Sequence, residues 1–199
     1  MNENHAILES DEWVAYIQEE VIPEVCAGVD LGGELIELGP GPGAATDVLR
    51  PRVRRLVAIE LEDPAAQKHA ERFAGTNVET VAGDATALGF ADNSFDSAAS
   101  FTMLHHVPTV ALQNRLLAEV LRVLRPGGVL IGSDSLASND LHLFHDGDTY
   151  NPVEPAAFLT RLLTLGYENI TLTVDHSLKF RAYKPDPSAT PYCSESDDE

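Results

Sequence analysis

The chain alternates between short apolar runs and stretches in which apolar residues recur every three or four positions. Trp13, Ile17 and Val21 follow one another at intervals of four residues, which predicts a helix with one apolar face over 11–26. Ser10 precedes this stretch and is a candidate N-cap, because its hydroxyl can accept a hydrogen bond from a free backbone N–H. The pattern therefore predicts an N-terminal helix that packs against the body of the protein.

The rest of the chain continues this alternation. Apolar runs predict strands over 34–38, 55–60, 77–82, 97–102 and 129–133. Periodic stretches predict helices over 44–50, 63–74, 111–124 and 155–165. Asp63 is expected to cap the helix that begins there, and the Arg-Pro-Gly-Gly turn at 125–128 is expected to precede the fifth strand.

Strands that alternate with helices are typical of βαβ units and a parallel sheet. The last two apolar runs, 170–175 and 179–183, instead predict a hairpin that inserts one antiparallel strand at the sheet edge. We expect a single domain over 1–184, in which the helix within 1–28 is either ordinary core or a lid over a pocket. The segment 185–199 contains three prolines, three serines and a final Ser-Asp-Asp-Glu, and we expect it to be a disordered acidic tail.

The composition narrows the possible partners. The 199 residues carry 32 acidic and 13 basic side chains, for a net charge of −19. Nucleic acids and anionic membrane surfaces attract basic proteins, so neither is an expected partner. Such an acidic surface fits either adaptation to high salt or an ordinary acidic enzyme.

The sequence contains no recognisable targeting segment and only two cysteines. No apolar run approaches the roughly 18 residues of a membrane span, and the first residues lack the pattern of a signal peptide, so the expected location is cytoplasmic. Cys26 falls in a predicted helix and Cys193 in the polar tail, which argues against a structural disulfide. No Cys-x-x-Cys pair is present to bind zinc.

Candidate chemistry begins at the turn Glu-Leu-Gly-Pro-Gly-Pro-Gly, residues 37–43. Gly39, Gly41 and Gly43 let the backbone turn sharply and approach a ligand closely, and the following helix offers free N–H groups. The spacing also fits the dinucleotide fingerprint, so the turn alone leaves three interpretations open: an adenosyl cofactor, a dinucleotide, or a simple tight turn.

Two acidic residues follow later strands. Glu60 ends the second strand, 23 residues after Glu37, where a carboxylate can accept hydrogen bonds from ribose hydroxyls. Asp84 follows the third strand in Gly-Asp-Ala, where it can accept from an adenine amino group or simply cap its own turn. Glu62 and Asp63 are rival acids for the ribose, although a solvated charge and a helix cap explain them better.

The order of these motifs resembles the class I S-adenosylmethionine-dependent methyltransferases, and among them the small-molecule branch of ubiquinone and menaquinone methyltransferases. The resemblance covers residues 34–135 and extends more weakly to the closing hairpin near Tyr183. It implies a Rossmann-like, doubly wound, mostly parallel seven-stranded sheet with an antiparallel C-terminal strand. It also implies S-adenosyl-L-methionine as the cofactor.

The resemblance assigns roles to single residues. Glu37 and Gly39 would face the methionine end of the cofactor, and Gly41 and Gly43 would shape the turn beside it. Glu60 would bind the ribose hydroxyls. Leu61, Asp84 and the backbone of Ala85 would contact the adenine. Phe101 would line the cofactor near its methionine portion. The acid of the second strand is followed here by Leu-Glu-Asp, which departs from the commoner Asp-x-Ser/Asp-Pro pattern.

Two histidine pairs lie where an acceptor is expected. His105 and His106 follow the fourth strand and are candidate bases, because imidazole titrates near neutral pH, although packing or capping is an equally open role for one of them. His142 and His145, with Asp146, follow the fifth strand at a spacing that puts both rings on one helix face. A metal site there is conceivable, but two histidines and one aspartate are few ligands, so we expect a substrate-facing loop and no metal.

The acceptor is expected to be a small molecule. The fourth strand is followed by Phe-Thr-Met-Leu, which lacks the Asn/Asp-Pro-Pro-Tyr sequence of adenine amino methylation, and no Pro-Cys pair is present for attack on cytosine. The first hypothesis is thus a methyltransferase, monomeric or homodimeric. The alternatives are a non-catalytic module that binds the cofactor or its demethylated product, and an NAD(P)-dependent oxidoreductase.

Overall fold

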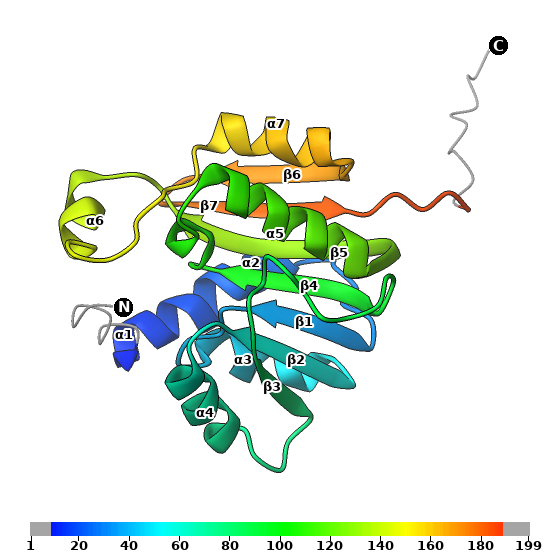
Figure 1. Ribbon diagram of the computed structural model, residues 1–199, viewed down its shortest axis with the longest axis horizontal. Helices are drawn as coiled ribbons and strands as arrows, with labels where there is room; N and C mark the ends of the chain where they lie inside the picture. Colours follow the sequence, from blue (N-terminus) through cyan, green and yellow to red (C-terminus); the bar gives the residue numbers. More distant parts are fainter. Residues whose placement is uncertain (1–8, 189–199) are drawn as a thin grey trace.

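A computed structural model describes residues 9–188 (Figure 1). Its centre is a seven-stranded sheet with the order β3-β2-β1-β4-β5-β7-β6. The strands are β1 (Glu34–Leu38), β2 (Arg55–Glu60), β3 (Val78–Ala82), β4 (Phe95–Phe101), β5 (Leu124–Ser135), β6 (Glu168–Val174) and β7 (Ser177–Tyr183). The first five pair in parallel, and β7 lies antiparallel between β5 and β6. The expected fold class, including the inserted antiparallel strand, is confirmed.

The N-terminal helix runs without a break through α1 (Asp11–Ala15), a π-helical stretch η2 (Tyr16–Val21) and α2 (Ile22–Cys26). The hydroxyl of Ser10 accepts a hydrogen bond from the backbone N–H of Trp13 at 3.3 Å, as expected of an N-cap. Periodicity predicted the length of this helix, whereas nothing in the apolar pattern marked its π-helical middle.

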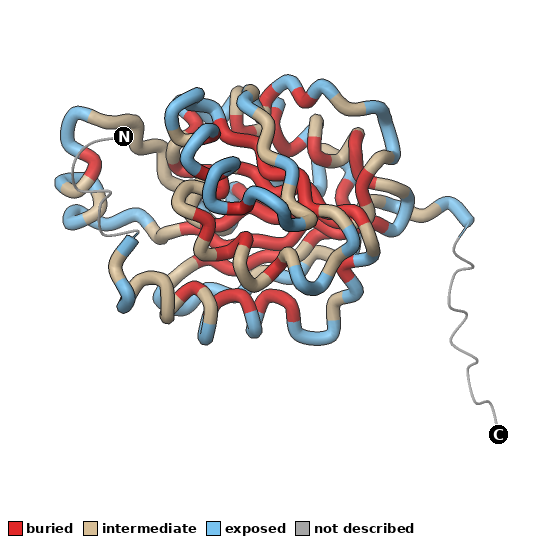
Figure 2. Tube along the Cα trace, turned by 90° about the horizontal axis from the view of Figure 1, so that it is seen from below, coloured by how far each residue is buried: buried red, intermediate tan, exposed pale blue. Residues whose placement is uncertain are grey.

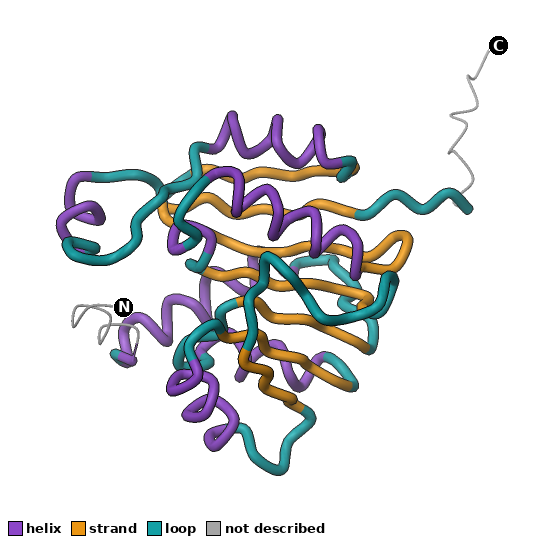
Figure 3. Tube along the Cα trace, viewed as in Figure 1, coloured by secondary structure: helices purple, strands orange, loops and turns teal. Residues whose placement is uncertain are grey.

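The other helices are α3 (Ala44–Leu49), α4 (Asp63–Arg72), α5 (Val110–Val123), α6 (Asn139–Phe144) and α7 (Pro155–Leu165). Two single 3-10 turns are η3 (Arg50–Arg52) and η4 (Leu104–His106). One buried cluster joins α5 and α7 to one face of the sheet, and the other joins the N-terminal helix and α3 to the opposite face. Figures 2 and 3 show the result, a buried sheet between helical layers. The strands can therefore be buried on both faces of the sheet, as in β1, where all five residues are buried.

Two local expectations were wrong. Asp63 does not cap α4: it is the first helical residue, and Glu62 occupies the cap position without a side-chain hydrogen bond. The Arg-Pro-Gly-Gly segment does not precede β5 but lies inside it, because Phe95 pairs with Leu124 while Ser97 pairs with Val129. The additional residues on β5 form a bulge, and pairing resumes beyond them.

All parallel strands direct their carboxyl ends to one edge of the sheet, where α6 and the start of the N-terminal helix also lie (Figure 1). Glu60 and Phe101 are the last residues of β2 and β4, and the glycine turn and Asp84 follow β1 and β3. The topology thus gathers the candidate residues of the sequence at one place.

Among residues 9–188, no helix is both long and apolar enough to cross a membrane. Cys26 is a buried free thiol, and burial raises the pKa of this thiol. Cys193 and most of the expected acidic tail, residues 189–199, fall outside the described part of the chain.

Candidate active site

A cavity of about 420 Å³ opens at the carboxyl edge of the sheet. This volume is within the range of small-molecule sites, roughly 300–1,000 Å³. The residues expected to hold a cofactor line it with one exception: Glu37, Gly39, Gly41, Glu60, Leu61, Asp84, Ala85 and Phe101 are present, and Gly43 is not. The predicted cofactor residues therefore come together around a single space.

The two candidate bases are separated. His106 lines the cavity, whereas His105 is buried behind the cavity wall and does not line it. Only His106 is therefore placed to contact an acceptor directly.

The structure shows for each glycine of the turn what a side chain at that position would meet. Gly39 has φ +59°, and a Cβ there would overlap the side chain of Met103. Gly43 has φ +94° and is the N-cap residue of α3, and a Cβ there would overlap the ring of Phe73. Gly41 has φ +52° and open space where its Cβ would be. At Gly41 no side chain stands between the backbone and the cavity, so a ligand could approach the backbone closely there.

Glu37 is the most deeply buried acid of the cavity wall, with 2% of its surface exposed. Burial raises the pKa of its carboxyl group to about 7, and a hydrogen bond from the Thr46 hydroxyl, at 2.7 Å to Oε2, opposes that rise. The negative charge of Asp47 raises the pKa further. A cation beside Glu37 would reverse the effect of burial, so the site is suited to a positively charged group.

Glu60, at the end of β2, and Asp84, just after β3, both accept hydrogen bonds from backbone N–H groups of the loops that follow them. Oε1 of Glu60 accepts a hydrogen bond from the backbone N–H of Leu61 at 2.9 Å. Leu61 is 69% exposed at the cavity, which suits its side chain to pack on a flat apolar ligand. Oδ1 of Asp84 accepts from the backbone N–H of Thr86 at 2.8 Å, so Asp84 both caps its turn and lines the cavity.

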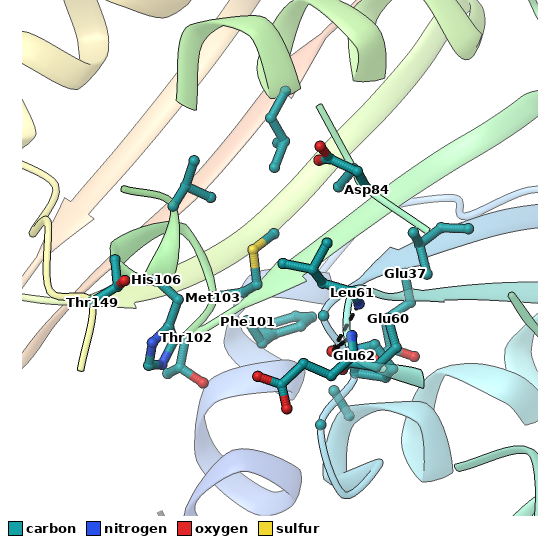
Figure 4. A pocket seen from close by; sticks show the side chains of 18 of the residues that line it. Glu37, Glu60, Leu61, Glu62, Asp84, Phe101, Thr102, Met103, His106 and Thr149 are labelled. Carbon is teal, nitrogen blue, oxygen red and sulfur yellow. Dashed lines mark hydrogen bonds between the residues drawn. The ribbon is translucent and has the colours of Figure 1, made fainter. Parts of the chain in front are cut away.

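Figure 4 shows Glu60, Leu61 and Glu62 at one end of the cavity and His106 and Thr149 at the other. Phe101 and Met103 lie between these ends. The far end thus combines an imidazole and a hydroxyl, and Val107, Leu112 and Leu116 add apolar side chains to the cavity lining.

Sequence reasoning missed part of this lining. Thr102 directly follows β4 and has φ +50°, a conformation that is uncommon for a residue with a Cβ. Met103 fills the space that Gly39 leaves. Their position after a parallel strand was the available signal, whereas Thr149 lies in a loop that no motif connected to the site.

His105 is only 4% exposed. Its Nδ1 lies 2.7 Å from Oδ1 of Asp134, and its backbone N–H donates to Oδ2 of the same carboxylate at 3.3 Å. Asp134, near the end of β5, is fully buried. This pair anchors η4 to the sheet and thereby places the neighbouring His106 at the cavity.

The second histidine pair of the sequence is divided as well. His145 is buried, and its ring centroid lies 5.0 Å from that of His105 and 5.1 Å from that of His106. His142 is exposed on α6, and its ring centroid lies 6.2 Å from that of Tyr150. The group that meets in space therefore takes members from both sequence pairs.

Comparison with known proteins agrees with this fold. The profile of the family described as "Methyltransferase domain" matches residues 36–132. A demethylmenaquinone methyltransferase of Thermobifida fusca is 31% identical over 175 residues, which cover 85% of this chain and 64% of the relative. A probable S-adenosylmethionine-dependent methyltransferase of Mycolicibacterium smegmatis is 28% identical over 85% of this chain and 65% of its own length. The chain thus spans just under two thirds of either relative.

Solved structures show the same fold. A protein of Pyrococcus horikoshii superposes with a TM-score of 0.77 over 94% of this chain and all of its own, at 19% identity. Profile, relatives and architecture together define a methyltransferase domain. The profile, the relatives and the fold together support a class I S-adenosylmethionine-dependent methyltransferase, the family that the motifs resemble.

Proposed function

We propose that this protein transfers a methyl group from S-adenosylmethionine to a small-molecule acceptor. The observation that carries the proposal is one continuous cavity, which runs from the glycine turn at Gly41, past Glu60, to the apolar pocket beside His106. A cofactor in the first half would leave the second half open to an acceptor.

The first half fits the cofactor in charge and shape. Glu37 would accept hydrogen bonds from the ammonium group of the methionine portion, and Glu60 from the ribose hydroxyls. Asp84 would accept from the adenine amino group while Leu61 packs on the ring. Hydrogen bonds to a carboxylate contribute about 1.5–3 kcal/mol each, so three such acids would account for much of the affinity.

The second half fits an acceptor that is largely apolar. S-adenosylmethionine supplies a methyl group on a positively charged sulfur, and the acceptor displaces it in line. The chain would contribute alignment, because Met103, Val107 and Leu112 form apolar walls that hold a ring or chain in one orientation. Positioning of this kind can contribute about 7–11 kcal/mol. The name of the Thermobifida fusca relative makes a demethylated naphthoquinol the first acceptor to test.

Two other functions are compatible with the glycine turn but agree less well with the rest of the structure. A module that only binds the cofactor has no need of open space beyond the methyl group, yet here the cavity continues to His106 and Thr149. An NAD(P)-dependent oxidoreductase does not account for the antiparallel β7 between β5 and β6, nor for the methyltransferase profile.

Calorimetry with S-adenosylhomocysteine and with NAD tests the proposal. We expect S-adenosylhomocysteine to bind one site per chain and Asp84→Ala to weaken this binding by about tenfold or more, the loss of one charge-assisted hydrogen bond. Asp63→Ala is the matched control, since Asp63 is an exposed acid beside the same loops but outside the cavity lining. Binding of NAD alone, or equal losses in both variants, would contradict the proposed site.

Turnover is tested separately. Release of S-adenosylhomocysteine is measured with a panel of quinols and phenols in the presence of S-adenosylmethionine. Acceptor-dependent release supports transfer. Tight cofactor binding without release for any acceptor of these classes would favour the binding module.

A further inference from the structure

Three imidazoles from two distant segments meet beside the cavity. The candidate ligand nitrogens of His105, His106 and His145 all lie within 4.8 Å of one another. His105 and His106 belong to η4, after β4, whereas His145 follows α6, much later in the chain. The centroids of the rings of His105 and His106 are 4.2 Å apart, so the cluster is compact.

The orientation of His105 matches that of a metal ligand. Its Nδ1 lies 2.7 Å from Oδ1 of the buried Asp134, which also accepts a hydrogen bond from the backbone N–H of Ser135 at 2.8 Å. A carboxylate accepts and does not donate, so the proton of the neutral ring is on Nδ1 and the lone pair is on Nε2. Carboxylate–histidine pairs of this kind orient the histidines of many metal sites.

His145 is oriented in the same way by the backbone. Its Nδ1 donates to the carbonyl oxygen of Leu141 at 2.7 Å, which again puts the lone pair of the neutral ring on Nε2. The ring of Tyr150 stacks on it at 4.6 Å between centroids, with an interplanar angle of 16°. His145 is 3% exposed, so its orientation is fixed by packing as well as by the hydrogen bond.

We propose that His105, His106 and His145 bind one divalent transition-metal ion, with Zn²⁺ as the best match to three imidazoles. Zinc binds histidine nitrogen at about 2.0–2.1 Å, and tetrahedral ligands at that distance are about 3.3 Å apart. Since the three nitrogens already lie within 4.8 Å of one another, each pair needs to close by about 1.5 Å at most, which small side-chain rotations provide.

The metal would have two consequences for this protein. It would tie the loop after α6 to the end of β4, which are two of the segments that enclose the far end of the cavity. Because His106 lines the cavity, the ion would also lie at the acceptor end, where its fourth position can take water or an acceptor oxygen. In that state His106 is a ligand and not a base. The site was not expected from the sequence, and it does not depend on the proposed function.

The test uses the full chain without a polyhistidine tag, treated with a chelator and then dialysed. Co²⁺ is titrated as a spectroscopic probe, and Zn²⁺ is then added in competition, with no cofactor present. We expect one equivalent of Co²⁺ per chain, visible absorption of a four-coordinate nitrogen site, and displacement by Zn²⁺. Absence of stoichiometric binding to the folded wild-type protein would overturn the proposal without bearing on methyl transfer.

Variants locate the ion. His106→Ala and His145→Ala should each lower the affinity for Zn²⁺ by about tenfold or more, and Asp134→Asn should lower it by about 10–100-fold through the orientation of His105. His142→Ala is the matched control, because this exposed histidine lies on α6 close to His145 in sequence and outside the cluster. Circular dichroism confirms that each variant is folded. If His142→Ala lost as much affinity as His145→Ala, or if His106→Ala and His145→Ala both kept it, the three histidines would not be the ligands.

Discussion

The Thr46 hydroxyl donates a hydrogen bond of 2.7 Å to Oε2 of Glu37, and it does so in a place where both residues are almost completely buried. Thr46 lies in the first turn of α3, just after the glycine turn 37–43, and Glu37 is the first residue of that turn, near the end of β1. The bond therefore closes the turn from both sides and is the main contact that favours the ionised carboxylate against burial. The charge of Glu37 thus depends on the balance between burial, which favours the protonated form, and the Thr46 hydrogen bond, which favours the ionised form. A change of pH or a bound ligand can shift that balance.

The stability of the protein should depend on pH through Glu37. The pKa of its carboxyl group rises from 4.5 to about 7 in the folded state because the group is buried. Between these values the folded state keeps a proton that the unfolded chain has lost, so the free energy of unfolding falls as pH rises through this window. The loss is on the order of 3 kcal/mol. Urea unfolding of wild type and Glu37→Gln from pH 4.5 to pH 8 measures this loss. The free energy of unfolding of wild type should fall further below that of Glu37→Gln as pH rises. If the two free energies changed in parallel with pH, the pKa assigned to Glu37 would be wrong.

Cofactor binding should release a proton from Glu37. At pH 6 the buried carboxyl group of the free protein is mostly protonated, and an ammonium group beside it would favour ionisation. Calorimetry with S-adenosylhomocysteine in buffers of different ionisation enthalpy should show release at pH 6 and little at pH 8. The Glu37→Gln variant, which has no proton to lose, should show none at either pH. Equal proton release by wild type and variant would assign the proton to another group.

The role of Gly41 can be tested against a glycine with the same backbone strain. Gly41 and Gly75 have φ +52° and +77°, and at both positions an added Cβ would have no other atom within 4 Å. Alanine should cost either site about 1 kcal/mol of stability through its left-handed backbone. Only Gly41→Ala should also weaken S-adenosylhomocysteine binding, because only there does the methyl group enter the cavity. Similar affinities of the two variants, measured by calorimetry, would show that Gly41 is not the contact.

His105 and His106 should differ although they are neighbours. In the metal-free protein, His106→Ala should lower kcat by about 10²–10⁴-fold with little change in cofactor affinity, because its ring is placed to remove the acceptor proton. His105→Ala should chiefly lower stability, by about 1.5–3 kcal/mol, because the buried Asp134 loses a hydrogen-bond partner. Steady-state kinetics and thermal unfolding of both variants separate these effects. The assignment fails if His105→Ala is as stable as wild type and His106→Ala is as active.

Most of the fold could be predicted because its signals are local. The bounds of α7 follow from Pro155 at its start and from Gly166, which ends it with φ +100°. The strand-internal bulge at the Arg-Pro-Gly-Gly segment could not be predicted, because proline and glycine ordinarily end an element. Only the pairing with β4, a contact distant in sequence, keeps that segment in the sheet.

The meeting of the three acids at one cavity could be predicted from the sequence, whereas the meeting of the histidines could not. Glu37, Glu60 and Asp84 each lie at or just beyond a strand end, and parallel topology brings strand ends together. The contact of His145 with His105 depends on how the loop after α6 folds back onto η4, and the periodicity of apolar residues gives no information about the path of a loop. Asp134 lies one residue beyond the predicted strand 129–133, and only the structure shows it as the partner of His105.

The N-terminal helix could serve as core or as a lid, and its contacts allow the two roles to be separated. Trp13 and Ile17 line the cavity, and the side chain of Gln18 donates to the carbonyl oxygen of Ala44 at 3.0 Å, which holds the helix on the first turn of α3. Trp13→Ala should therefore weaken S-adenosylhomocysteine binding about tenfold, or about 1.4 kcal/mol, by opening that wall to water. Tyr16→Ala is the matched control, because this ring lies 5.8 Å from that of Trp13 but outside the cavity lining. Calorimetry and thermal unfolding decide between the roles: if both variants lose stability alike and neither loses affinity, the helix is core alone.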